Sequence, residues 1–419
     1  MYQLLSVIVS ILSYGAVPNN TTVNNASAIN QAINDCADRG GGVVNVPRGS
    51  FSTGSIFLKS GVTLNIEEGG VIKGTSHVGD YSPLITTADL SKYDTGQGTV
   101  NYNSATDPIW SQALIFGVGL KDSRITGTGT IDGNNVRNPL GEEHMRGPHG
   151  ILLADSEKIK IDGVKIVNAS NYAILAYKIE DVTIRNVSIE GGWDGIHVRG
   201  AQRMMIKNCQ ISTGDDGIAG GYWEQMRIDG CKINSSCNGI RMIQPSVNVI
   251  FNDCDIYGPG VFEHITSHSK ASLAAINIEP GAWGKAPGLL DRITIRNCRM
   301  KEVLTPLSVT LSDDNHLGLI TLKDVKATDI TNHALSVKSW GIASTDRVEL
   351  KNCDMEFRGI DDPNLPSWFE THGTNEWPVF PSWGLYFRNV KKIKQKNVKL
   401  HLKGKDYRNA VIEDKSDRE

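Results

Sequence analysis

Apolar and polar residues alternate in short runs that recur along much of the chain. The pattern apolar–x–apolar–x–(Asn, Asp or Gly)–(Cys or Val)–x–apolar starts at Ile159, Val182, Met204, Met226 and Val249, so successive starts lie 22 or 23 residues apart. Alternation with a period of two indicates β-strands, and the regular spacing indicates that each repeat is one coil of a solenoid. The frame of a leucine-rich repeat is absent. The pattern therefore predicts an all-β fold, a right-handed parallel β-helix.

The end of such a stack exposes unpaired strand edges and needs a cap. Residues 26–39 carry apolar side chains at helical spacing, and Gly40–Gly42 ends that helix. We therefore expect a first strand at 13–17 and a capping helix, both within about residues 13–45 of a single domain that covers 1–419. Longer gaps between the later repeats predict loop insertions that would wall a cleft, at about 80–110, 258–291 and 359–383.

The charge balance narrows the classes of partner. The chain has 43 Lys and Arg against 46 Asp and Glu, a formal net charge of -3, so there is no basic field to bind nucleic acid or an anionic membrane. No apolar stretch is long enough to span a bilayer. The apolar segment Leu4–Leu12 lacks the basic region and cleavage site of an intact signal peptide. We interpret it as a trimmed or replaced leader and expect a secreted or periplasmic protein.

Most of the seven cysteines occupy one position of the repeat. A cysteine at the same place in successive coils is typical of a small buried core residue, not of a disulfide or a metal ligand. There is no CxxC pair, so we expect no zinc site and no cofactor. These cysteines are Cys209, Cys231, Cys254, Cys298 and Cys353.

Acidic residues gather at one position of three consecutive repeats. The segments Trp193–His197, Asp215–Ala219 and Cys237–Arg241 align without a gap at an offset of 22 residues. Like positions of successive coils stack, so these segments and two earlier ones predict an outward column, flanked by Asp215. The column contains His149, Tyr172, Asp194, Asp216 and Asn238.

Carboxylates on adjacent coils repel one another and raise one another's pKa, which favours a catalytic role. Glycoside hydrolysis needs one carboxylic acid and one carboxylate. A coil step of about 4.8 Å plus a sideways offset agrees with the ~6.5–9.5 Å between carboxylates that inversion requires. Two neighbouring acids would keep a third one protonated as the general acid. A structural ladder of Asp and Asn and a calcium site are the alternatives.

The chain resembles glycoside hydrolase family 28, the polygalacturonases and their relatives, over nearly its whole length. The resemblance lies in Ser13–Ala16, Ala28–Ile33, Gly40–Pro47, Ile125–Gly133, and above all in Asp194 with Gly214–Asp216. It implies an inverting mechanism in which Asp215 is the general acid, while Asp194 and Asp216 activate water.

The positions that align with the family's substrate-binding motifs carry different residues in this chain. The family's Asn-Thr-Asp reads Gly192–Asp194, and the histidine of its Gly-His-Gly motif is replaced by Asn238. Its Arg-Ile-Lys motif, which grips a uronate carboxylate, aligns with Asn277–Glu279. Glu279 would repel a substrate carboxylate. Unless Arg241 or Arg199 neutralises that charge, the leaving-group side of the cleft should prefer a neutral sugar.

Further candidates could contact the substrate. We expect His197 and Arg241 to point outward, because their neighbouring isoleucines face the core. Trp193, Tyr222, Trp223 and Trp283 are candidates for stacking on sugar rings, and His149 and Tyr172 for lining the cleft. The inserted loops, with Trp283 in one and Trp368 and Trp377 in another, would close one end of the cleft, which favours removal of terminal sugars. His264 and His268 are expected to be solvated.

The predicted function is an inverting glycoside hydrolase of a pectic or related plant or algal glycan, exo-acting and not specific for plain polygalacturonate. Its expected partner is an oligo- or polysaccharide substrate. A β-helix lyase or epimerase acting on uronates is the first alternative, and a non-catalytic glycan-binding β-helix is the second. The oligomeric state is open.

Overall fold

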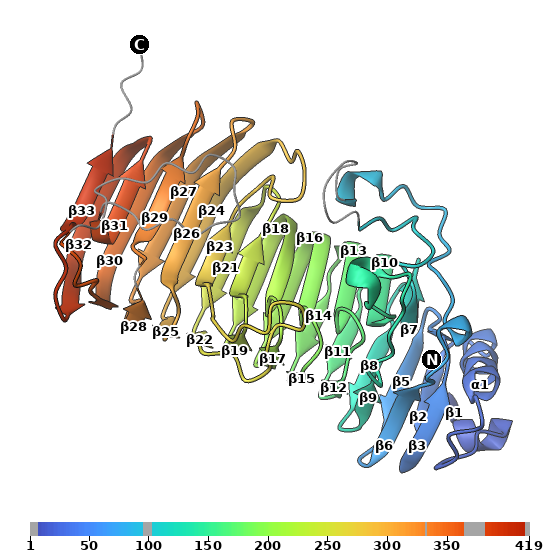
Figure 1. Ribbon diagram of the computed structural model, residues 1–419. Coiled ribbons are helices and arrows are strands. Elements are labelled where there is room, and N and C mark those ends of the chain that lie inside the picture. The colour runs from blue at the N-terminus through green and yellow to red at the C-terminus, as the bar shows by residue number, and fades with distance from the viewer. Residues whose placement is uncertain (1–6, 95–102, 332, 364–381, 415–419) are drawn as a thin grey trace. The chain divides into compact units, whose positions relative to one another are not determined.

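The computed structural model describes residues 7–94, 103–331, 333–363 and 382–414. The chain divides into two compact units, Met1–Ile211 and Ser212–Glu419. Within each unit, short strands pair in parallel with strands one coil earlier or later in the chain (Figure 1). The chain therefore folds as a parallel β-helix, as the repeat predicts. The expectation of a single domain stays a prediction.

The elements of the first unit are β1 (Val7–Ser10), η1 (Ile11–Tyr14), α1 (Ala26–Asp38), β2 (Gly42–Val46), β3 (Gly49–Thr53), β4 (Ile56–Phe57), β5 (Val62–Ile66), β6 (Gly70–Gly74), η2 (Val78–Asp80), η3 (Ser91–Tyr93), β7 (Ala113–Val118), β8 (Arg124–Gly127), β9 (Thr130–Asp132), η4 (Glu142–His144), β10 (His149–Glu157), β11 (Lys160–Asp162), β12 (Lys165–Val167), β13 (Ile174–Glu180), β14 (Thr183–Arg185), β15 (Ser188–Glu190), β16 (Ile196–Lys207) and the start of β17 (Gln210–Thr213).

The strands of the second unit are β18 (Ile218–Asp229), β19 (Lys232–Ser235), β20 (Asn238–Met242), β21 (Val247–Asn252), β22 (Asp255–Tyr257), β23 (Ala274–Ile278), β24 (Gly288–Arg296), β25 (Arg299–Lys301), β26 (Thr305–Leu311), β27 (Asn315–Lys323), β28 (Lys326–Thr331), β29 (Leu335–Ser339), β30 (Ser344–Arg358), β31 (Ser382–Arg388), β32 (Val390–Lys403) and β33 (Asn409–Asp414).

The core consists of columns of apolar side chains, one from each coil. In the first unit Ile151 pairs with Ile174, which pairs with Ile196, and all three are fully buried. In the second unit Ile218 pairs with Ile240, which pairs with Ile276. Burial of each such side chain contributes roughly 1.5–3 kcal/mol, so the alternation seen in the sequence provides the main stabilisation of every coil.

The polar position of the repeat is a turn with a left-handed backbone. Asn208, Asp253, Asn297 and Asn352 have φ between 52° and 54°, and Gly230 has φ 63°. Asn, Asp and Gly adopt this conformation at the lowest steric cost, which explains why the repeat is restricted to them. The five cysteines of the repeat are buried free thiols, as predicted, and the other two cysteines are free as well.

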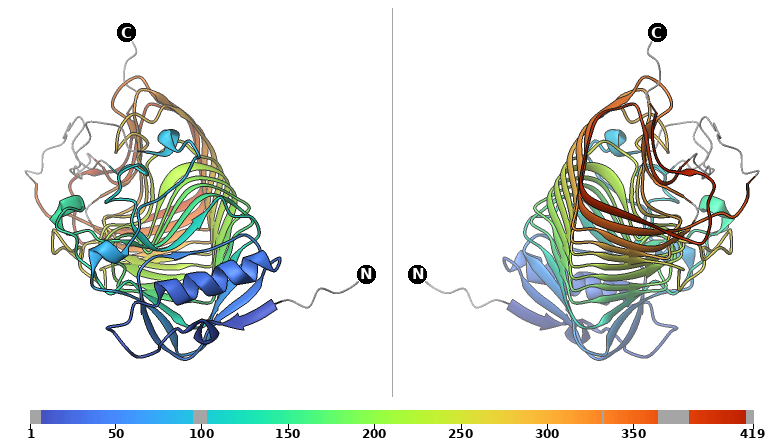
Figure 2. Two further views of the ribbon diagram at one scale, coloured as in Figure 1. Left: turned by 90° about the vertical axis from the view of Figure 1, so that its right-hand side faces the viewer. Right: turned by 90° about the vertical axis from the view of Figure 1, so that its left-hand side faces the viewer.

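Helix α1 caps the first coils, as the helical pattern predicts. It packs against β1, β2, β4 and β5 and lies across their end (Figures 1 and 2). Its buried side chains are Ile29, Ala32, Ile33 and Cys36. The expected first strand at 13–17 is wrong, because that segment contains the end of η1. The first strand is β1, whose apolar residues pair with β2.

One of the three predicted loops needs correction, and the other two lie partly outside the described residues. The range 258–291 contains β23 and the start of β24, because Ala274–Ile278 pairs with β20 and forms a coil of its own. Residues 95–102 of the first loop and 364–381 of the third, including Trp368 and Trp377, lie outside the described residues. None of the described helices is both long and apolar enough to cross a membrane.

The left-handed turn gives a prediction about stability. Asn208 is exposed and has φ 52°. Asn208→Val places a β-branched residue in this conformation and should lower the free energy of unfolding by about 1–2 kcal/mol. Asn208→Gly is the matched control and should leave it nearly unchanged. Urea unfolding of the three proteins measures this, and equal stability of the Val and Gly variants would contradict it.

Candidate active site

The register of the predicted column can be followed through the strand pairing of the first unit. The registers of β10 with β13 and of β13 with β16 place His149, Tyr172 and Asp194 at the same position of successive coils. Asp194 immediately precedes the bend into β16, and its carbonyl accepts a hydrogen bond from the backbone N–H of Ala173 at 2.9 Å. The repeat thus fixes the place of Asp194 through backbone pairing.

Asp194 is held by a buried histidine and arginine. Its Oδ2 lies 2.6 Å from Nδ1 of His197, and Arg199 donates from Nε to Nε2 of His197 at 3.0 Å. The exposed fractions of these three residues are 3%, 3% and 1%. His197 and Arg199 do point away from the core, but Arg199 donates to the carbonyl of Asn103 at 2.8 Å, so the segment before β7 covers them. Neither reaches solvent to bind a sugar.

Aromatic rings close the earlier part of the column. Tyr172 stacks on His197 with ring centroids 4.6 Å apart, and Trp110 packs edge-on against both His149 and Tyr172. Burial lowers the pKa of His149 to about 3 and raises the pKa of Tyr172 well above its usual value. The expectation that His149 and Tyr172 line an open cleft is corrected, because Trp110 lies over both.

A loop that the repeat does not predict reaches the same region. The guanidinium of Arg146 lies 3.6 Å from the ring centroid of Trp193 and forms ion pairs with Glu142 and Glu143 at 3.4 Å. Trp193 is thereby buried under Arg146. The segment between β9 and β10 has no periodicity, so no sequence signal identified Arg146.

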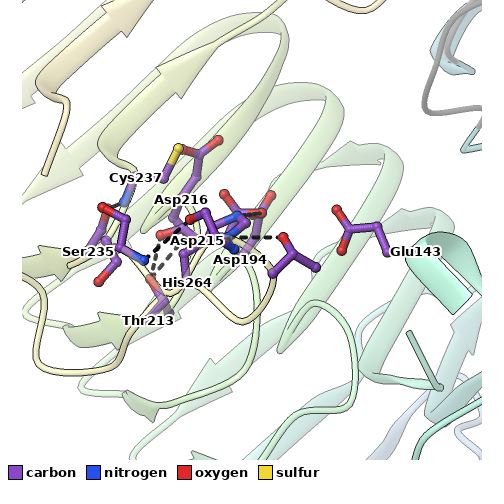
Figure 3. A network of polar contacts seen from close by, with 12 residues as sticks. Glu143, Asp194, Thr213, Asp215, Asp216, Ser235, Cys237 and His264 are labelled. Carbon is purple, nitrogen blue, oxygen red and sulfur yellow. Dashed lines mark hydrogen bonds and ion pairs between the residues drawn. The ribbon is translucent and has the colours of Figure 1, made fainter. Parts of the chain in front are cut away.

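Asp216 is a buried carboxylate of the second unit (Figure 3). Its Oδ1 accepts from the backbone N–H of Asn238 at 2.9 Å and from Nδ2 of Asn238 at 2.7 Å, and its Oδ2 lies 3.6 Å from Nη1 of Arg241. Burial raises the pKa of Asp216, and the charge of Asp215 adds to this, while Arg241 and Asn238 oppose it. Asn238 thus occupies its predicted position and acts on a carboxylate.

Asp215 lies beside a histidine that the sequence suggested was solvated. Nε2 of His264 is 3.8 Å from Oδ2 of Asp215, and both side chains are mostly covered (Figure 3). His264 belongs to the loop between β22 and β23. The backbone N–H of Ser267 donates to its Nδ1 at 3.3 Å, so the ring proton of a neutral His264 is on Nε2, facing Asp215.

Arg241 lies between two carboxylates. Its guanidinium is 3.6 Å from Asp216 and 3.8 Å from Oε2 of Glu279, and it lies over the ring of Trp283 at 5.1 Å. Asn277 pairs with Arg241 in register and its Nδ2 lies 3.5 Å from Glu279. The structure therefore meets the condition that the sequence left open, because Arg241 offsets the charge of Glu279. Its Nε is buried and makes no hydrogen bond among the described residues.

Lys338 adds a cation that sequence analysis missed. It is buried on β29, with Nζ 3.3 Å from Oγ of Ser308 and 3.2 Å from Oγ of Ser336. Burial lowers its pKa to about 8, and the charge of Glu279 partly opposes this. The spacing of the later coils is irregular, so the sequence did not show that β29 brings Lys338 near Glu279.

The cluster of Asp215, Asp216 and Cys237 does not suit a hard cation such as calcium. Ligand atoms of Asp215, Asp216 and Cys237 lie within 4.8 Å of one another. Burial raises the pKa of the Cys237 thiol well above its usual value, and Arg241 already offers a positive charge to Asp216. A hard cation prefers oxygen ligands, so a protonated thiol and an adjacent guanidinium do not suit calcium.

Trp223 is too deeply buried to contact a sugar. Its side chain is 1% exposed, and a ring so enclosed has no free face on which a sugar could stack. Trp283 stays a candidate through its contact with Arg241.

Comparison with known proteins relates the chain to pectin-degrading enzymes. Residues 116–278 match the family model of the right-handed β-helix region, which confirms the predicted handedness. The chain is 32% identical over 164 residues to an exo-poly-alpha-D-galacturonosidase of Dickeya chrysanthemi, covering 38% of this chain and 25% of that protein. It is 28% identical over 192 residues to a probable polygalacturonase of Vitis vinifera, covering 43% of this chain and 35% of that protein. The chain thus matches about a quarter to a third of the length of these relatives.

Solved structures extend the likeness of fold over the whole chain. An exopolygalacturonase from Thermotoga maritima has a TM-score of 0.58 at 18% identity, covering 95% of this chain and 93% of that one. The A-module of a mannuronan C-5 epimerase from Azotobacter vinelandii has a TM-score of 0.51 at 13% identity, covering 96% of this chain and 99% of that one. At these identities the likeness shows the fold alone.

The buried lysine gives a prediction about pH and stability. The pKa of Lys338 falls from 10.5 to about 8 on folding, so the charged form disfavours the fold and stability is lost as the pH falls from about 10.5 to about 8. Near pH 7, Lys338→Met should therefore have a free energy of unfolding higher than that of the parent protein by up to about 3 kcal/mol, and should unfold at a higher temperature. The gain should vanish near pH 10.5. The exposed Lys351→Met is the control and should show no such trend. A gain that does not change with pH would contradict the assignment.

Proposed function

We propose that the chain is a glycoside hydrolase of a pectic glycan, with Asp194, Asp215 and Asp216 as its catalytic carboxylates. The observation that carries the proposal is the pair Asp215 and Asp216, one beside His264 and the other fixed by Asn238 and Arg241. Asp194 is assigned to the same set through the 22-residue repeat of the sequence. The identities with two polygalacturonase-type proteins support the substrate class.

Each carboxylate has a distinct task in the proposed inverting reaction. Asp215 gives its proton to the glycosidic oxygen as the bond from that oxygen to the anomeric carbon breaks. A water molecule attacks the anomeric carbon from the opposite side and loses a proton to Asp194 or Asp216. Arg241 supports this role because its charge favours the ionised form of Asp216 against the effect of burial.

The structure weakens the two arginines as bases for the lyase or epimerase alternative. Such an enzyme needs a base that removes the proton at C5 of a uronate, and the sequence offered only Arg199 and Arg241. Arg199 is buried and donates to His197 and Asn103, whereas Arg241 is paired with Asp216 and Glu279. A guanidinium held in ion pairs stays protonated and cannot accept a proton.

We further propose that the enzyme removes sugars from chain ends and accepts galacturonate. The charge of Glu279 would repel a uronate, but Arg241 and Lys338 lie near it and offset that charge. Since pectic polymers are extracellular, a secreted or periplasmic location fits this role.

The mechanism is tested with oligogalacturonides of defined length. We expect products that have gained one water molecule, inverted configuration at the new reducing end, no unsaturated sugar, and activity that persists with a chelator. Asp215→Asn should lower kcat by ~10²–10⁴-fold, the usual contribution of proton transfer. Asp255→Asn, a surface residue paired with Arg299, is the control and should keep normal rates. Unsaturated products would make the protein a lyase, and binding without cleavage would make it a glycan-binding protein.

Specificity is tested at Glu279. Glu279→Gln removes the charge that competes for Arg241 and should lower KM for oligogalacturonides by about 2- to 5-fold, as expected for a partly exposed ion pair of about 0.5–1 kcal/mol. KM for neutral oligosaccharides should not change. Glu279→Asp keeps the charge and is the matched control. Equal effects on both substrate classes would place the substrate carboxylate away from Arg241.

A further inference from the structure

A continuous chain of buried hydrogen bonds leads to Asp194 within the first unit. The carbonyl of Asn103 accepts from Nη1 of Arg199 at 2.8 Å, and Arg199 donates from Nε to Nε2 of His197 at 3.0 Å. Nδ1 of His197 then lies 2.6 Å from Oδ2 of Asp194. All three side chains are at least 97% buried, so water does not compete for these bonds.

The direction of this chain fixes the proton on His197. The Nε–H of arginine can only donate, so Nε2 of His197 must accept and carries no proton. The neutral ring therefore has its proton on Nδ1 and donates it to Asp194, which accepts as a carboxylate. A second proton, on Nε2, would face the Arg199 guanidinium at 3.0 Å, where two donors and two positive charges meet. Arg199 thus opposes the charged form of His197.

The surroundings hold the ring and the guanidinium in place. Tyr172 stacks on His197 with an angle of 1° between the ring planes, and Arg199 lies over Tyr177 at 5.8 Å. Gly200 has φ 87°, and a Cβ at this position would overlap the ring of Tyr93. The glycine therefore lets Tyr93 pack directly over β16, at the residue that follows Arg199. The hydrogen-bonded series Arg199, His197 and Asp194 is called the relay below.

A neutral histidine at this place has a chemical consequence for Asp194. A cation in direct contact with a carboxylate would stabilise its charge and make it a weaker proton acceptor. The imidazole instead orients the carboxylate through one hydrogen bond and contributes no net charge. The positive charge of Arg199 lies on the other side of the His197 ring. It offsets part of the free-energy cost of burying the negative charge of Asp194.

We propose that Arg199 and His197 are positioning residues that hold Asp194 ionised, oriented and basic, so that it takes the proton from the attacking water. This rests on the proposed function for the role of Asp194, whereas the protonation of His197 follows from the hydrogen bonds alone. The two parts are tested separately.

The first experiment determines which ring nitrogen of His197 carries a proton, and it needs no substrate. In ¹⁵N NMR spectra of the intact protein, His197 should have a protonated Nδ1 and an unprotonated Nε2 from about pH 5 to pH 8. His197→Asn identifies its signals. A ring that becomes charged near its ordinary value of about 6.5, or that carries its proton on Nε2, would overturn the relay whether or not the protein is a hydrolase.

The second experiment measures kcat and KM on oligogalacturonides. His197→Asn keeps an amide donor near the place of Nδ1 and should retain kcat within about 10-fold, whereas His197→Leu should lose about 100-fold, within the range of a proton-transfer partner. KM should change by less than about 3-fold in both. Equal losses in the two variants, or a loss in KM alone, would overturn the positioning role.

Arg199→Met separates positioning from packing. Without the guanidinium, His197 becomes free to gain a proton below about pH 6.5, and kcat should fall there and recover near pH 8. Other titratable groups near these residues in this unit are His149, Tyr172, Tyr177, Glu142, Arg146 and Asp94, and all are kept in the variant. A uniform loss at every pH, together with a lower unfolding temperature, would show that Arg199 only fills space.

Discussion

Backbone pairing between coils is the constraint on which the rest of this structure depends. Parallel strands in register lie about 4.8 Å apart, so a residue at one position of a coil meets its equivalent in the next coil. For isoleucine this is favourable on every coil, because like side chains pack into one continuous column. For a charged residue it is unfavourable, because like charges on neighbouring coils repel. Charged residues that stack where water is excluded therefore need a group that offsets their charge.

The carboxylates of this chain are offset in two different ways. Asp216 has a cation close by, since Arg241 lies 3.6 Å from its Oδ2 and shares its charge with Glu279. Asp194 meets a neutral imidazole first, with the cation of Arg199 behind it. Both arrangements allow a buried carboxylate to stay ionised, but only the first places a positive charge next to it. The same backbone repeat thus supports two carboxylates in different electrostatic surroundings.

The regular part of the molecule could be predicted from the sequence, and the loops could not. The alternation and the 22-residue spacing identified the fold, the capping helix α1 and the column through His149, Tyr172 and Asp194, because each depends on local pattern and on register. The segments before β7, between β9 and β10, and after β22 have no period. They bring Trp110, Arg146 and His264 onto the coils. The alternation predicted that His197 and Arg241 point outward, but it could not show that the segment before β7 covers His197 and Arg199.

Where the sequence departs from the motifs of the family that it resembles, other side chains can supply groups of the same type. Asn238 stands where a histidine was expected, yet its amide still donates to Asp216, and an imidazole lies against Asp215 through His264 from a loop. The Arg-Ile-Lys position has become Asn277–Glu279, yet positive charge returns through Arg241 one coil earlier and through Lys338 on β29. In a solenoid, neighbouring coils present equivalent positions a few ångströms apart, so a side chain of the required type can come from another coil or from a loop. Register along the columns is therefore a better guide to function in this fold than identity at a single motif.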